Sequence, residues 1–166
     1  MSRPIEGDWG VDPTDEDRAF EKWWQELAKT IEKIFNIIPW NDLEVVKAIF
    51  VKLGCIAKEI KKMRAEDSDR EITDTEVAEI IQKHGLQDKA KKIAQIIPWN
   101  DSEAVEDISM ALSIAFGLVR QMLDEPPNVP IDEVYLKEGE EGEVYIIVTK
   151  KEIEPGFVAY KVDRFY

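Results

Sequence analysis

Ile37-Ile38-Pro39-Trp40-Asn41-Asp42 and Ile96-Ile97-Pro98-Trp99-Asn100-Asp101 are the same six-residue stretch, 59 positions apart. Outward from these hexapeptides, residues 14–63 align with residues 73–122 at the same offset and without a gap. Seventeen of the fifty aligned positions are identical. A repeat of this length indicates one supersecondary unit used twice, so we expect two related structural units.

Each hexapeptide predicts that one helix ends and another begins. Pro39 biases the residue before it away from helical backbone angles, which closes the first helix. Asn41 is suited to cap the next helix, and Glu44 three residues later would complete a capping box. Trp40 would then pack on Val45 as a hydrophobic staple. Because the connection is short, we expect the two helices of each copy to pack antiparallel as a hairpin.

Apolar residues recur at three- and four-residue steps on both sides of each hexapeptide, which is the period of an amphipathic helix. In the second copy a glycine follows His84, and glycine readily closes a helix, so the first helix of that copy is expected in two pieces. The predicted helices cover about 15–38, 43–63, 74–84, 86–97 and 102–124. The last is apolar nearly all round between Ile108 and Val119, and we predict that it is the most buried element.

The composition changes beyond the second copy. Residues 125–130, Glu-Pro-Pro-Asn-Val-Pro, predict a stiff linker that is not helical. β-Branched and aromatic residues then predict three strands with glycine-containing turns between them. The predicted strands cover about 134–136, 144–149 and 157–162.

Together these patterns predict an α+β fold that is mostly helical. Two tandem-duplicated helical hairpins are expected to form a four-helix bundle, with a small three-stranded antiparallel β-meander packed at one side. The predicted segments are an N-terminal extension (1–13), hairpin one (14–63), a linker (64–72), hairpin two (73–124), the proline-rich linker (125–130) and the meander (131–166).

Charge and composition exclude several functional classes. Thirty-five acidic against twenty-two basic residues give a net charge of −13, which repels nucleic-acid phosphates and favours a partner with a basic surface. The longest run without a charged residue, Ile108 to Val119, is too short to cross a bilayer. The single cysteine excludes an internal disulfide framework, and no secretory signal is recognisable, so we expect an intracellular, cytoplasmic protein. The chain has only four asparagines and five glutamines. Proteins of thermophiles contain few of these residues, so a thermophilic source stays open.

Two kinds of surface are candidates for binding a protein partner. The Trp40 and Trp99 pair could expose two related indoles, although helix termination already accounts for both residues. Acidic residues near the start of each copy could form two related negative patches. The partner-binding candidates are Trp40, Trp99, Asp12, Asp15, Asp17, Glu71, Asp74, Glu76, Phe165 and Tyr166.

Phe165 and Tyr166 end the sequence Val162-Asp-Arg-Phe-Tyr. This ending resembles the hydrophobic end of the motif by which replication proteins dock on sliding clamps. The glutamine usual in that motif is absent, and Ala159 stands in its place. Apolar residues that alternate along this segment also fit a terminal strand that packs on the protein itself.

A metal-dependent enzyme is the alternative that the carboxylates raise. The pairs Glu76/Glu79 and Glu103/Glu106 have the i, i+3 spacing that puts two carboxylates on one helical face, where they could bind Mg²⁺. This arrangement resembles the acidic helix pairs of all-helical nucleoside-triphosphate pyrophosphohydrolases, and the resemblance implies Mg²⁺-dependent nucleotide hydrolysis. That family has Glu-x-x-Asp as its second motif, whereas this chain has Glu103-Ala-Val-Glu106.

The remaining reactive side chains are interpreted as structural. His84, the only histidine, is expected at a helix C-terminus, and Cys55 is expected in the core. The sequence has no Gly-x-Ser-x-Gly turn and no glycine-rich phosphate loop. We therefore predict a non-enzymatic acidic interaction module, an adaptor or inhibitor, without metal or cofactor and without direct contact to membranes or nucleic acids. A DNA-mimic inhibitor and the pyrophosphohydrolase are the alternatives, and a homo-oligomer stays open.

Overall fold

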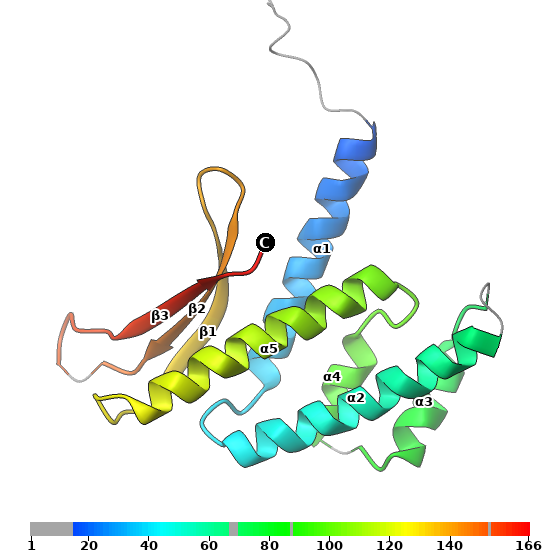
Figure 1. Cartoon of the computed structure of the whole chain (residues 1–166), viewed down its shortest axis with the longest axis horizontal. Helices are drawn as coiled ribbons and strands as arrows, with labels where there is room; N and C mark the ends of the chain where they lie inside the picture. The colour runs from blue at the N-terminus through cyan, green and yellow to red at the C-terminus, as the bar shows by residue number, and fades with distance from the viewer. Residues whose placement is uncertain (1–14, 67–69, 87, 153) are drawn as a thin grey trace, which may run out of the picture.

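The computed structural model describes residues 15–66, 70–86, 88–152 and 154–166, without the side chains of residues 15–18 and 20. Within these residues five helices precede three strands (Figure 1). The predicted α+β, mostly helical class is confirmed. The elements are α1 (Asp15–Ile37), α2 (Leu43–Glu66), α3 (Asp74–Lys83), α4 (Asp88–Ile96), α5 (Ser102–Asp124), β1 (Ile131–Glu138), β2 (Val144–Lys150) and β3 (Tyr160–Arg164).

The predicted helix break in the second copy is confirmed. Thr73 and Glu76 form a capping box at the start of α3, and His84 is the C-cap at its end. Gly85 follows with a φ of 68°, a conformation that glycine adopts without a steric penalty. The second copy therefore has two short helices, α3 and α4, which pack on each other where the first copy has the single helix α1.

Close helix packing joins the two copies. α1 packs against α4 and α5, and α2 packs against α4. Figure 1 shows α1 and α2 leaving their shared corner in different directions, so the antiparallel hairpins and the bundle built from them are not confirmed. At this corner the buried Trp40 indole folds back on α1 and donates a hydrogen bond to the Phe35 carbonyl oxygen at 2.9 Å.

The strands form an antiparallel sheet in the order β1-β2-β3. One face packs against α5, and β1 also contacts α1 (Figure 1). β1 begins three residues earlier than predicted, at Ile131. Phe157 was predicted to start the third strand but lies in a turn, because its N–H donates to the Glu154 carbonyl oxygen at 3.0 Å. The third strand starts instead at Tyr160.

A buried lysine ties the sheet to the end of α5. Lys150 is 2% exposed, and its Nζ donates to the carbonyl oxygens of Glu125 and Pro127 at 2.6 and 2.7 Å. Carbonyl groups at a helix C-terminus carry partial negative charge, so they stabilise an ammonium group there. Residues 125–130 connect α5 to β1 without helix, as predicted, and include a cis peptide bond between Pro126 and Pro127.

α2 and α5 each have a side that is open to solvent. α5 contributes eight buried residues to the core, but Ser109, Met110 and Ser113 in its uncharged stretch are exposed. Cys55 on α2 is exposed too, so its predicted core position is wrong. The reason is helical phase, since Ile56 and Ile60 are the α2 residues that point into the core here. The open sides of these two helices frame the candidate site.

Candidate functional site

The two corners have the same internal hydrogen bonds. The Trp40 Nε1 donates to the Phe35 carbonyl oxygen at 2.9 Å, and the Trp99 Nε1 donates to the Ala94 carbonyl oxygen at 2.8 Å. Each indole is only 6% exposed. The possibility that Trp40 and Trp99 present an exposed pair is therefore wrong, and the structural interpretation fits, because each ring closes its own corner.

The helix caps at the corners are aspartates. Asp42 Oδ1 accepts a hydrogen bond from the Val45 N–H at 3.3 Å, and Asp101 Oδ1 accepts one from the Ala104 N–H at 3.1 Å. The predicted Asn41–Glu44 capping box is wrong by one residue, since the side chain that reaches the third N–H of each helix follows the asparagine. The predicted staple is also wrong, because Val45 is exposed.

Each asparagine instead holds the backbone of a distant isoleucine. Asn41 accepts from the Ile131 N–H at 2.7 Å and donates to its carbonyl oxygen at 3.1 Å. Asn100 does the same to Ile72, at 2.6 and 2.8 Å. Ile72 and Ile131 are themselves 59 residues apart. The repeat did not reveal this pair, because residue 131 lies beyond the aligned residues 73–122, in the segment predicted as a separate meander.

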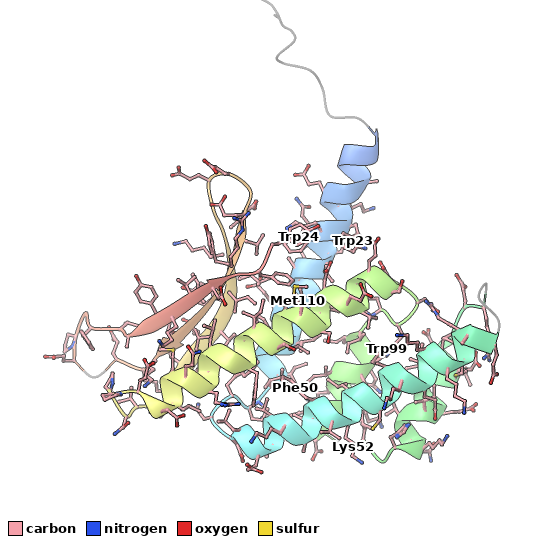
Figure 2. The ribbon with its side chains drawn as sticks, in the orientation of Figure 1. Trp23, Trp24, Phe50, Lys52, Trp99 and Met110 are labelled. Carbon is pink, nitrogen blue, oxygen red and sulfur yellow. The ribbon has the colours of Figure 1, made fainter. Side chains whose placement is uncertain are left out.

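A groove runs between α2 and α5, which lie side by side in opposite directions (Figures 1 and 2). Phe50 of α2 and Phe116 of α5 meet edge to face at one end, with ring centroids 5.6 Å apart. Figure 2 shows Phe50 in this groove and Trp99 towards its other end. The aromatic pair fills the first half of the groove, so any opening lies in the second half.

The second half of the groove contains an apolar pocket of about 170 Å³. Seven residues are about two helical turns. Ala57 therefore lies on the Phe50 face of α2, and Ser109 lies on the Phe116 face of α5. Both line the pocket together with Trp99, and their small side chains leave the space that the two rings occupy in the first half. The other lining residues are Phe50, Leu53, Gly54, Ile97, Val105, Ile108, Leu112 and Ser113. We call this space the Ala57–Ser109 pocket.

The repeat explains why the two halves differ. The position equivalent to Phe50 is Ser109, and the position equivalent to Phe116 is Ala57, each at the offset of 59. Both large residues thus lie in one half of the groove and both small ones in the other. Sequence comparison of the copies displays these substitutions, but only the antiparallel placement of α2 and α5 reveals that they act in pairs.

Charged side chains are exposed on both helices of the groove. Lys58 and Lys61 are exposed on α2, whereas Glu103 and Glu106 are exposed on α5. Burial raises the pKa of Asp107, and the nearby Glu103, Glu106 and Asp101 carboxylates raise it further. Such clustering concentrates negative potential near the start of α5.

The four carboxylates considered for Mg²⁺ do not converge. Glu76 accepts hydrogen bonds from the Thr73 backbone N–H and hydroxyl and is paired with Arg70. Glu79 lies on α3, and Glu103 and Glu106 lie on α5. Within the part of the chain that the structure describes, no group of three or more potential ligand residues could hold a metal ion.

The other partner-binding candidates are dispersed. Asp12 lies outside the described residues, as do the side chains of Asp15 and Asp17. Glu71 and Asp74 are exposed near the start of α3.

Phe165 is 7% exposed, so it is not free for docking elsewhere in this conformation. Its N–H donates to the Val144 carbonyl oxygen at 2.8 Å. Tyr166 stacks on Trp24 of α1, with ring centroids 4.6 Å apart. These contacts match the terminal-strand interpretation of the chain end.

Comparisons with protein-family models, curated proteins and solved structures found no match. Among the described helices, none has both the length and the apolar character of a membrane-spanning segment.

Proposed function

We propose that this chain is a non-enzymatic, acidic protein–protein interaction module, an adaptor or inhibitor, that holds one apolar side chain of its partner in the Ala57–Ser109 pocket. The observation that carries this proposal is the pairing of two small residues where the other half of the groove has two phenylalanine rings. A cavity of about 150 Å³ with apolar walls accepts a benzene-sized group, so the pocket suits one leucine, methionine or phenylalanine side chain. A buried anchor of this kind commonly dominates the affinity of a protein interface.

The negative charge of the chain favours a partner that carries basic residues beside its apolar anchor. Acidic residues cluster at the start of α5, the helix whose apolar and serine side chains form one wall of the pocket, and the chain as a whole has a net charge of −13. Complementary charge accelerates association and fixes orientation, while the apolar anchor supplies most of the affinity. The DNA-mimic alternative would also use a basic partner, but Glu76, one of its proposed phosphate substitutes, is already held by Thr73 and Arg70.

We further propose that the two copies form one duplicated unit with an approximate two-fold relation across the α2/α5 groove. The matching indole and asparagine hydrogen bonds at the two corners support it. So do the equivalent contacts of α1 with α5 and of α4 with α2. In this arrangement helices of different copies pack on each other to form the four-helix core: α1 packs on α4 and α5, and α2 packs on α4.

Selection from a random peptide display library tests the proposed function. Ala57→Phe and Ser109→Phe each place in the pocket a ring that the other half of the groove already accommodates. Ala48→Phe is the matched control, because position 48 is exposed on the opposite face of α2. We expect peptides with one large apolar residue beside Lys or Arg, whose binding is lost in both pocket variants and retained in the control. Absence of enriched peptides, or binding that both pocket variants retain, would refute the proposal.

A further inference from the structure

The outer edge of the sheet is available for pairing. β3 is an edge strand, since the order is β1-β2-β3. Its neighbouring residues Ala159 and Phe165 bond to β2, through Lys150 N–H to Ala159 O and Phe165 N–H to Val144 O. Because antiparallel pairing alternates along a strand, the N–H and C=O groups of Tyr160, Val162 and Arg164 point to the free edge.

This edge is unusually apolar for a strand in contact with water. Among the described residues, eight large hydrophobic side chains are exposed, and five of them lie at or beside β3. Tyr160 is 66% exposed and Val162 is 49% exposed. An exposed apolar edge strand is a template for pairing with another strand. The five residues are Phe157, Val158, Tyr160, Val162 and Tyr166.

The sequence of β3 is complementary to itself when read antiparallel. With Val162 opposite Val162 of a second copy, Lys161 lies opposite Asp163 and Tyr160 lies opposite Arg164. Lys161 and Asp163 thus each meet a residue of opposite sign, and each Arg164 can lie over the Tyr160 ring. Lys161 and Asp163 would be at non-hydrogen-bonded positions, where side chains of opposing residues are closest.

We propose that two copies of this chain associate through β3, pairing it antiparallel about Val162 to form a continuous six-stranded sheet. A second copy of the chain fits this edge, because residues 160–164 read antiparallel place Lys161 opposite Asp163 at both positions. The interface is isologous, as expected for a two-fold dimer. It uses none of the pocket residues and does not depend on the proposed function.

Two contacts of the single chain would be rearranged in the dimer. The Arg164 N–H donates to the Asp163 carboxylate at 2.8 Å, and this N–H would donate instead to the Tyr160 carbonyl oxygen of the second copy. The freed Asp163 carboxylate can then face Lys161 of the second copy. Lys161 already pairs with Glu125 at 3.1 Å and would lie between two carboxylates.

Charge variants of the full chain test the proposal by sedimentation velocity over a concentration series. Lys161→Asp and Asp163→Lys each create two like-charge pairs across the edge, so each should raise the dimer dissociation constant about tenfold or more. A mixture of the two variants pairs opposite charges at both positions and should restore a dimer of wild-type strength. The mixture separates the proposed register from any other mode of association.

Val162→Pro provides a second arm that does not depend on charge. It removes the outward N–H at the centre of the edge and no bond to β2, and proline is tolerated on edge strands. Val162→Thr keeps that N–H and is the matched control. We expect a monomer for the proline variant and a dimer for the threonine variant. A wild-type chain that stays monomeric at every concentration, or a dimer that survives Val162→Pro and both charge variants, would overturn the proposal.

Discussion

Replacing Asn41 or Asn100 by alanine tests the equivalence of the two corners. Each change removes two hydrogen bonds between a side-chain amide and the backbone of a buried isoleucine, Ile131 or Ile72. At about 1 kcal/mol for each hydrogen bond, each variant should lose about 2 kcal/mol of unfolding free energy. For a chain of this size that loss corresponds to a decrease in Tm of about 4–8 °C. Asn100→Ala should cost at least as much as Asn41→Ala, because Asn100 also accepts a hydrogen bond from Arg64 at 3.0 Å.

Equilibrium urea denaturation, followed by tryptophan fluorescence, measures both losses. Asn36→Ala is the control, since Asn36 is an exposed residue of α1, and its effect should stay within about 0.5 kcal/mol. The slope of free energy against urea should be unchanged, because the folded chain buries the same surface. If either corner variant behaves like the control, the two asparagines do not have equivalent roles and the reasoning from the repeat fails.

Three further variants report on other contacts. Trp23→Phe removes the 2.6 Å hydrogen bond from the indole Nε1 to the Asp101 carboxylate and should lower the unfolding free energy by about 1.5–3 kcal/mol in the same urea assay. Asp107→Asn should stabilise the chain at pH 7, because burial and nearby carboxylates raise the Asp107 pKa; thermal melts should show that gain vanish as the pH falls below 3.8. Glu59→Gln should do the opposite, since the Lys83 hydrogen bond lowers the Glu59 pKa: the wild type is more stable above pH 4.5 and loses its advantage as the pH falls through the folded-state pKa. A pH-independent difference for either carboxylate variant would contradict its assigned pKa shift.

Local signals predicted the helical elements well. Pro39 and Pro98 ended helices where backbone sterics require it, and Gly85 split the first helix of the second copy. The sequence did not distinguish which of two adjacent polar residues caps a helix, since Asn41 and Asp42 are both suitable. Asp42 caps the helix because the Asn41 side chain is hydrogen-bonded to the backbone of the distant Ile131.

The candidate site could not be predicted, because it depends on how distant segments meet. The sequence favoured a structural role for Trp40 and Trp99 and left exposed indoles as the alternative, and the hydrogen bonds to the Phe35 and Ala94 carbonyl oxygens decide for burial. The pocket requires the register of α2 against α5, which local periodicity does not contain. The substitutions that open it were visible in the repeat, but without that register they read as unrelated changes.

The Asn41–Ile131 contact also bears on the order in which the chain matures during synthesis. Asn100 bonds to Ile72, 28 positions earlier in the chain, so the partner of the second corner is already synthesised when Asn100 is added. The partner of Asn41 is Ile131, 90 positions further along the chain, so this contact closes a longer loop and can form only later in synthesis. The corner that emerges first from the ribosome is thus the last to be completed, and the nascent first half remains without its closing contact until the sheet begins.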